Sequence, residues 1–284
     1  MPSMEITTRI GCINMCSYCP QDKLINAYKS VSNILEMDLN TFKKCLDKIP
    51  VDINIHFSGF SEPWLNPHCT EMVVYSHKKG HKIQIFTTLV GMTLKDIEII
   101  KKIPFELFIV HLPDSDGKTN IEVNDNYMEI ITKVTKCLPN ALYIYYDNIQ
   151  TELEPLLKTV RKAKWDLVSR ARNIKIKGQE INIIPGRIRC TRALCQNVLL
   201  PNGDVILCCN DYGMKHVLGN LMKSNYDSLF SGEVYKKVTE GLMDDSIDIL
   251  CRYCETFVEQ VAVQKAENFG AHLLRRIRDI LKKV

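Results

Sequence analysis

Apolar residues form two kinds of pattern through the first two thirds of the chain. Short apolar or alternating runs predict strands at 5–10, 53–59, 82–88, 105–112 and 141–148, with a sixth near 167–169. Stretches with helical spacing predict helices at 37–49, 66–80, 93–103, 126–138 and 151–165. Repeated strand–helix units predict a parallel sheet and an α/β fold. A flat dinucleotide-binding sheet and an open barrel share this pattern, but no GxGxxG follows a strand.

The ends of these predicted helices carry recognisable signals. Thr93 is a candidate N-cap, whereas Pro67 and Gly80 lie near the two ends of the helix predicted at 66–80. Pro155 interrupts the last predicted helix early.

The pattern changes from about residue 175. Residues 197–209 predict a β-hairpin that turns at Asn202-Gly203, and 251–254 form a CxxC knuckle. The tail over 256–284 has apolar residues at helical spacing with basic residues between them, which predicts an amphipathic helix. This helix would dock on the body of the protein; a partner or membrane surface is the alternative. We therefore expect two domains, 1–174 and 175–284.

Composition narrows the class of protein. The 284 residues are 45% hydrophobic, which suits one large core or a core with a small appendage. No apolar run approaches the roughly 20 residues of a membrane span. The N-terminus has no signal-peptide pattern, so we expect a cytoplasmic protein with no membrane partner. A net charge of +4 without a basic, aromatic-rich stripe predicts no nucleic-acid partner.

A cytoplasmic location changes the interpretation of the 12 cysteines. Clustered cysteines in a reducing compartment hold metal more often than they form disulfides. Three isolated cysteines are instead predicted to be buried as small apolar residues: Cys45, Cys69 and Cys137.

Three cysteines at 12, 16 and 19 form a CxxxCxxC loop. Each iron of a 4Fe–4S cluster normally binds one cysteine thiolate. The spacing matches neither a zinc knuckle nor a bacterial ferredoxin run, and the next cysteine, Cys45, lies within a predicted helix. Three thiolates leave one iron without a protein ligand, so a small molecule can coordinate it.

The loop Cys12-Ile-Asn-Met-Cys16-Ser-Tyr-Cys19 resembles the signature of the radical S-adenosylmethionine (SAM) superfamily. The stretch FSGFSEP (57–63) is similar to the family's glycine–glutamate stretch, although the usual Gly-Glu pair is Ser-Glu here. IFTTLVG (85–91) resembles its third-strand motif, with Thr88 where asparagine is common. The resemblance implies a partial (β/α)6 TIM-like barrel, a SAM cofactor and a 4Fe–4S cluster on the loop. It also implies cofactor-binding roles for Tyr18, Gly59, Phe60, Ser61, Glu62 and Thr88.

Within that resemblance the roles differ. Tyr18 would pack near the adenine, and Glu62 would accept a hydrogen bond from the amino group of the SAM methionine. Gly59 and Ser61 would let the backbone approach the ligand closely.

A second set of cysteines follows the barrel sequence: Cys190, Cys208, Cys251 and Cys254. Together with LLPNGDVILCCNDYG, VLGNL and CRYCE, they resemble the short Twitch form of the SPASM/Twitch extension of radical SAM enzymes. The resemblance implies a small β-hairpin and helix domain with one auxiliary 4Fe–4S cluster. Four thiolates leave no open iron, so this cluster would pass electrons. Zinc is the competing metal for these four cysteines, and Cys195 could replace Cys190 as a ligand.

Alternation along the strands predicts a polar barrel lumen. Ile53, Ile55 and Phe57 should meet the helices, which turns the residues between them inward. The predicted lumen set is Asn54, His56, Ser58, Gln84, Thr88, His111, Tyr143, Tyr145 and Asp147. Such a lumen suits a hydroxyl-rich or charged substrate.

VSRARN (168–173) resembles a Ser-Arg-Ala-Gly-Asn stretch near the last barrel strand of related enzymes. There the arginine faces the active site, so Arg170 is a candidate catalytic residue. His111, which the alternation places in the lumen, is a second candidate.

The resemblance implies a radical enzyme, and several reactions remain open. The first hypothesis is two-electron oxidation of a small polar alcohol, sugar or aminocyclitol, in which the auxiliary cluster accepts an electron. The second is an epimerase in which a cysteine, Cys195 or Cys209, returns a hydrogen atom. The third is modification of a ribosomal peptide, although Cys12 leaves no room for an N-terminal leader-binding domain. A flavodoxin- or ferredoxin-type donor would supply electrons. The non-enzymatic alternatives are an iron–sulfur electron carrier and a zinc module.

Overall fold

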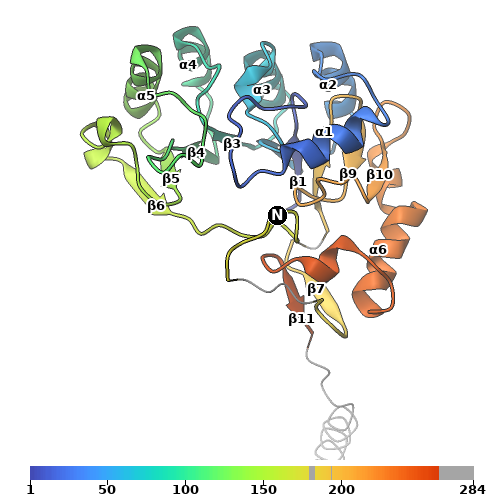
Figure 1. Ribbon diagram of the computed structural model, residues 1–284. Helices are drawn as coiled ribbons and strands as arrows, with labels where there is room; N and C mark the ends of the chain where they lie inside the picture. The colour runs from blue at the N-terminus through green and yellow to red at the C-terminus, as the bar shows by residue number, and fades with distance from the viewer. Residues whose placement is uncertain (179–182, 193, 262–284) are drawn as a thin grey trace, which may run out of the picture.

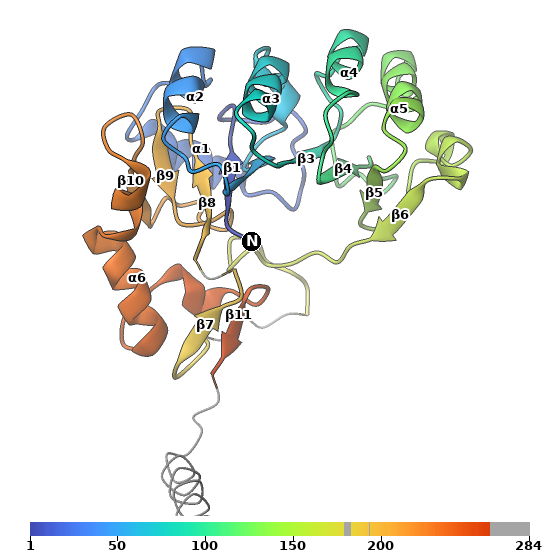
Figure 2. The same ribbon diagram turned by 180° about the vertical axis from the view of Figure 1, so that it is seen from behind.

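A sheet of nine strands organises the described part of the chain. Figures 1 and 2 show how it is arranged with the helices. The computed structural model describes residues 1–178, 183–192 and 194–261. The strands follow the order β10-β9-β8-β1-β2-β3-β4-β5-β6. Neighbouring strands from β1 to β6 are parallel: β1 (Ser3–Ile6), β2 (Asn54–Phe57), β3 (Ile83–Thr87), β4 (Leu107–His111), β5 (Leu142–Tyr145) and β6 (Arg161–Lys164). The predicted α/β fold with a partial TIM-like barrel is confirmed.

Four helices form a row along one face of this sheet in both views (Figures 1 and 2). They are α2 (Leu39–Leu46), α3 (Cys69–Lys78), α4 (Leu94–Ile100) and α5 (Asp125–Cys137). Thr93 caps α4, because its side chain accepts from Asp96 N while the Asp96 carboxylate accepts from Thr93 N. Helix α1 (Gln21–Lys29), which follows the cysteine loop, was not predicted.

The main core fills the space between the sheet and this row of helices. Ile55 and Phe57 are fully buried there, as the alternation on β2 predicts, and Phe57 packs against Phe42 of α2. On β5 the predicted alternation is wrong. Tyr143 is buried in the same core and Tyr145 packs against it, so the opposite set faces the lumen.

The predicted lumen position of Asp147 is also wrong. Its carboxylate pairs with Lys118 and lies 3.6 Å from Lys164 Nζ at a half-exposed surface site.

The predicted helix at 151–165 is wrong. Two short 3₁₀ turns, Thr151–Leu153 and Leu156–Lys158, lead into β6, and Pro155 between them has no N–H for a continuous helix. Strand β6 pairs with β5 from Leu142↔Arg161 to Tyr145↔Lys164. The sixth strand therefore lies at 161–164, rather than near 167–169.

The predicted hairpin is confirmed, and it extends the sheet. β8 (Gln196–Leu199) and β9 (Asp204–Ile206) are antiparallel, and Gly203 turns between them with φ +87°. β8 also pairs in parallel with β1, on the side opposite β2. β10 (Val217–Asn220) completes this edge. The boundary at 174/175 remains a prediction, but the hairpin continues the barrel sheet.

Three labelled elements lie below the sheet in Figure 1: β7 (Ile188–Cys190), α6 (Glu233–Met243) and β11 (Val258–Gln260). Along the chain, 3₁₀ turns at Tyr226–Phe230 and Leu250–Tyr253 lie before and after α6, and another, Pro63–Leu65, follows β2. β7 and β11 form a separate antiparallel pair. The start of the predicted C-terminal helix is therefore wrong, because a strand occupies 258–260. The rest of that helix, 262–284, lies outside the described residues.

Over the described part of the chain, no helix combines the length and apolar character required to cross a bilayer.

Candidate active site

A cavity lies at the carboxyl ends of β1 to β4, where loops leave a parallel barrel. Each of these strands contributes through its end or the loop that follows it. The cavity brings together predicted residues that are far apart in sequence: Cys12, Cys16, Tyr18, Cys19, Gly59, Phe60, Ser61, Glu62, Thr88, His111 and Arg170. Their individual roles remain predictions, but the predicted residues share one site.

The three loop thiols are partly buried in this cavity. Desolvation raises the pKa of Cys16 to about 12 and also raises the pKa of Cys12. A thiolate here therefore needs compensating positive charge, which metal coordination supplies. Within the described residues, no three His, Cys, Asp or Glu side chains are grouped tightly enough to ligate a single metal ion.

Glu62 joins the ends of β2 and β3 and is only 4% exposed. One carboxylate oxygen accepts from Thr87 Oγ1 (2.7 Å) and Trp64 N (3.2 Å). The other accepts from Thr88 N (2.6 Å) and Thr88 Oγ1 (2.8 Å). Desolvation still raises the pKa of Glu62, so a cationic group in the cavity would stabilise its carboxylate.

Only glycine fits at position 59, because of its backbone angle and a close neighbouring atom. Its φ is +73°, and a Cβ there would lie 2.2 Å from Thr7 Oγ1 on the neighbouring strand connection.

Unpaired polar atoms support a polar ligand in this cavity. Within the described chain, Ser61 Oγ, Asn14 Oδ1 and Gln21 Oε1 are buried without a hydrogen-bond partner, and all three residues line the cavity. Buried polar atoms normally find partners, so a ligand with complementary groups fits here. The thiols, Glu62 and these atoms suit a cluster with a polar, positively charged small molecule.

Two aromatic rings of the cavity lining, Tyr18 and His111, pack against further rings behind them. The rings of Tyr18 and Tyr146 are 4.5 Å apart, and His111 lies 6.4 Å from Tyr146 and 5.8 Å from Trp165. Desolvation, with Arg170 nearby, lowers the pKa of His111 to about 4, so its imidazole is neutral at pH 7. Sequence reasoning missed Tyr146, because the alternation on β5 was assigned to the wrong face.

Arg170 reaches the cavity from a strained turn. Arg170, Ala171 and Arg172 all have positive φ, of 52°, 54° and 65°. Arg172 occupies the position where the resembling stretch has glycine, the residue that tolerates this conformation best. Arg170 donates through Nε to Tyr18 O and through Nη1 to Tyr212 Oη, both at 3.1 Å.

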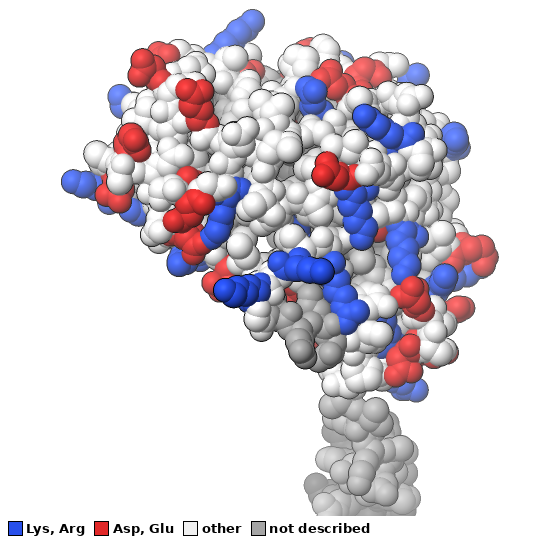
Figure 3. Space-filling model, viewed as in Figure 1, with Lys and Arg blue, Asp and Glu red and all other residues white. Residues whose placement is uncertain are grey.

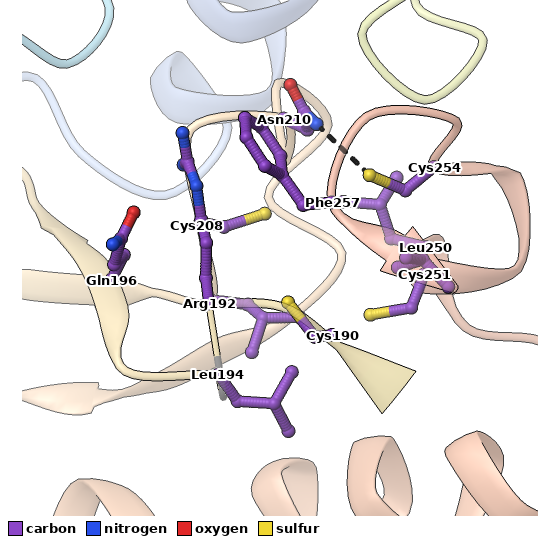
Figure 4. A pocket seen from close by; sticks show the side chains of 12 residues that line it. Cys190, Arg192, Leu194, Gln196, Cys208, Asn210, Leu250, Cys251, Cys254 and Phe257 are labelled. Atoms are coloured by element: carbon purple, nitrogen blue, oxygen red, sulfur yellow. Dashed lines mark hydrogen bonds between the residues drawn. The ribbon is translucent and has the colours of Figure 1, made fainter. Parts of the chain in front are cut away.

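A second cavity collects the other four cysteines. Figure 4 shows the sulfur atoms of Cys190, Cys208, Cys251 and Cys254 pointing into one space. Apolar side chains of Leu194, Leu207, Leu250 and Phe257 line the same cavity. Desolvation raises the pKa of Cys251 to about 12, and raises that of Cys208 as well.

Cys195 and Cys209 occupy different surroundings. Cys195 Sγ donates to Arg192 O at 3.0 Å, and Cys209 Sγ accepts from Arg192 Nη1 at 3.2 Å. Among the described residues, neither cysteine lines either cavity, whereas Cys190 lines the second. The geometry therefore favours Cys190 over Cys195 as a ligand and places no extra thiol at the first cavity.

Glu5 was missed by sequence reasoning. It lies on β1 opposite His56 in the parallel register, so alternation could have placed it on the inward face. Its carboxylate accepts from Ser58 Oγ, a lining residue of the first cavity, at 3.2 Å. It also lies 3.8 Å from Arg192 Nη1, and Arg192 lines the second cavity. Glu5 and Arg192 thus connect the two sites.

Comparisons with known proteins agree with this geometry. Residues 190–255 match the model of the SPASM iron–sulfur cluster-binding domain. The fold is similar to BtrN in complex with AdoMet and 2-DOIA (17% identity, TM-score 0.61, 95% of this chain and 97% of that chain). The chain has the fold of radical SAM enzymes that carry a SPASM domain.

Two further structures share the radical SAM/SPASM fold. SuiB of Streptococcus suis bound to the precursor peptide SuiA has 13% identity and a TM-score of 0.59, over 83% of this chain and 66% of SuiB. anSMEcpe with bound AdoMet has 12% identity and a TM-score of 0.57, over 89% and 86%. No curated protein sequence gives a significant match. The predicted resemblance to radical SAM enzymes with a SPASM/Twitch domain is confirmed.

Proposed function

We propose that this protein is a radical SAM enzyme whose first cavity holds a 4Fe–4S cluster and SAM. The observation that carries the proposal is the meeting of Cys12, Cys16 and Cys19 with Glu62 in one cavity. When bound, the cluster and SAM supply a 5′-deoxyadenosyl radical, which removes a hydrogen atom from an unactivated C–H bond.

The chain's own residues position the reactants. The buried carboxylate of Glu62 attracts the ammonium group of SAM, and Thr87 and Thr88 fix its orientation. The ring of Tyr18, which lines the cavity and packs against Tyr146, offers an aromatic surface for a planar base. Arg170 and neutral His111 lie where they can orient a polar substrate.

The second cavity would hold an auxiliary 4Fe–4S cluster ligated by Cys190, Cys208, Cys251 and Cys254. The match to an iron–sulfur domain over 190–255 supports iron–sulfur rather than zinc there. Four thiolates leave no iron open, so its function in this chain is electron transfer.

Oxidation of a small polar alcohol, sugar or aminocyclitol is the reaction we favour. Ser58, His111 and Arg170 give the first cavity hydroxyl, imidazole and guanidinium groups that can bind hydroxyls. The epimerase hypothesis has less support, since neither Cys195 nor Cys209 is among the described residues of that cavity. Peptide modification is the other enzymatic alternative.

Cleavage of SAM tests the class of enzyme. Anaerobically reconstituted, reduced protein should convert SAM to 5′-deoxyadenosine, and Cys12→Ala should abolish this product. Cys137→Ala, which changes a partly exposed cysteine of α5, is the matched control and should retain it. Intact clusters without 5′-deoxyadenosine would favour an electron carrier, and zinc in place of iron would favour a zinc module.

Product mass and incorporation of solvent deuterium then distinguish the possible reactions. They are measured on a panel of aminocyclitols, sugars and short peptides. Loss of two mass units from an aminocyclitol or sugar supports the dehydrogenase. Solvent deuterium in an otherwise unchanged product selects the epimerase, and turnover of a peptide alone selects peptide modification.

We also propose a reducing compartment and a protein electron donor. All twelve cysteines, each within the described residues, are free thiols. Figure 3 shows both signs of charge on the viewed face, with several basic side chains gathered in its lower part. An acidic donor of the flavodoxin or ferredoxin type is compatible with such a surface.

A further inference from the structure

Tyr212 connects the second half of the chain to the first cavity. It follows Cys208 by four residues, yet its side chain lines the cavity of Cys12, Cys16 and Cys19. Tyr212 is 1% exposed, and its ring packs edge-on against Phe60 at 4.7 Å. Its hydroxyl oxygen lies 3.7 Å from Cys19 Sγ.

The direction of this hydrogen bond follows from the neighbours of Tyr212. Arg170 Nη1 lies 3.1 Å from the tyrosine oxygen, and a guanidinium group can only donate. The oxygen therefore accepts from Arg170, which leaves the hydroxyl hydrogen for the sulfur of Cys19. Gln21 Nε2 donates to the same sulfur at 3.2 Å. The sulfur of Cys19 thus accepts hydrogen bonds from two side chains, Tyr212 and Gln21.

The segment that carries Tyr212 is held firmly. Asp211 accepts from Lys215 N (2.8 Å) and His216 N (2.7 Å) through its carboxylate. Asn210 O accepts from Asn173 Nδ2 at 2.7 Å, and Asn210 Nδ2 donates to Cys254 Sγ at 3.6 Å. Figure 4 shows this last contact. Residues 208–212 therefore touch both sets of cysteines.

We propose that Tyr212 is a positioning residue that sets the reduction potential of the cluster at Cys12, Cys16 and Cys19. The inference rests on the proposed function, because it requires that cluster. Reduction adds negative charge to the cluster and its sulfurs, so a hydrogen-bond donor stabilises the reduced form. The SPASM half of the chain thereby tunes the cluster of the barrel half.

Redox titration of the two-cluster protein, followed by electron paramagnetic resonance, tests this inference. Tyr212→Phe removes the hydroxyl but keeps the ring, and it should move the first cluster to a more negative potential. A tenfold change in its one-electron reduction equilibrium, or about 59 mV, is the expected size. Gln21→Leu, which removes the other donor, should shift the potential in the same direction.

The matched control is Tyr28→Phe. Tyr28 is also fully buried, and its hydroxyl donates to Ile34 O at 2.7 Å, away from the cysteines. This control should leave both potentials unchanged.

The signal that changes on addition of SAM identifies the first cluster. An unchanged potential in Tyr212→Phe with both clusters present would overturn the inference, as would a shift confined to the auxiliary cluster. Failure of the proposed function has a different outcome: the wild-type protein itself would lack a cluster that responds to SAM.

Discussion

His56 shows how burial of one side chain makes stability depend on pH. It lies on the inward side of β2, and desolvation, with Arg192 nearby, lowers the pKa of its imidazole to about 4. The unfolded chain has a histidine pKa of about 6.5. Between these values the unfolded state binds more protons, so stability falls as pH falls from about 6.5 towards 4.

We therefore expect the thermal unfolding midpoint to decrease between pH 7 and pH 5. His56→Gln cannot take up this proton and should make the decrease smaller. His77→Gln changes an exposed histidine and should leave the pH dependence as in the wild type. Equal slopes for His56→Gln and wild type in circular dichroism melts would contradict this explanation.

Strain is concentrated beside Arg170. Three consecutive residues without glycine adopt left-handed conformations, which cost about 1–2 kcal/mol each. Local hydrogen bonds compensate, because Ser169 Oγ accepts from Arg172 N at 3.0 Å and Arg170 O accepts from Asn173 Nδ2 at 2.5 Å. The strained turn is where the chain brings Arg170 to the first cavity.

Among the elements, those with local signals were predictable from the sequence. The strands β2 to β5 are apolar or alternating runs, the helices α2 to α5 have helical spacing, and Thr93 supplied a cap. The site residues on the cysteine loop and on FSGFSEP were found through motifs, and the structure places them in one cavity. Because these motifs follow parallel strands, they lie at the same end of the sheet.

Elements whose sequence does not alternate between apolar and polar residues were not predictable. Every residue from Leu142 to Tyr146 is apolar or aromatic, so alternation could not identify the inward face of β5. Strand β6 is the basic sequence Arg-Lys-Ala-Lys, which gains its strand conformation by pairing with β5. Tyr212 could not be placed at the first cavity, because its contact with Cys19 spans 193 residues.

The CxxC turn depends on one buried arginine between its cysteines. Arg252 is 1% exposed and donates through Nη1 to Ile184 O (2.9 Å) and Gly186 O (2.5 Å). Its Nη2 donates to Gly241 O at 2.6 Å. Hydrogen bonds from this charged group hold two other backbone segments, 184–186 and the end of α6, against the CxxC turn.

Arg252→Met should lower the free energy of unfolding by about 3 kcal/mol, because buried carbonyls lose their partners. The control Arg189→Met removes an exposed pair with Glu259 and should cost under about 1 kcal/mol. Denaturant titrations followed by circular dichroism measure both changes. Similar losses for the two variants would show that the buried hydrogen bonds are not the cause.

At the scale of the whole molecule, the two sites share one structural support. β8 and β9 continue the sheet from β1, and the segment after β9 supplies Cys208 and Tyr212. Glu5 on β1 and the partly buried Arg192 add a polar link between the cavities. The barrel and the cluster domain are therefore coupled mechanically by the sheet and electrostatically by this pair.

A fragment of residues 1–174 should not fold as an independent unit. It lacks β8, whose Val198 and Leu199 are fully buried, and it exposes the hydrogen-bonding edge of β1. We expect aggregation in size-exclusion chromatography, and co-expression of residues 175–284 should restore a monodisperse complex. A monomeric fragment with a cooperative thermal transition would contradict this expectation.

The position of β1 between β2 and β8 also means that β1 is synthesised long before one of its partner strands. Residues 3–6 leave the ribosome well before one of their two partners, Gln196–Leu199. At a synthesis rate of about 5–20 residues per second, the first strand waits roughly 10–40 s for that neighbour. During this interval the thiols of the first loop are translated but not enclosed, so metal loading before completion would occur at an unprotected site.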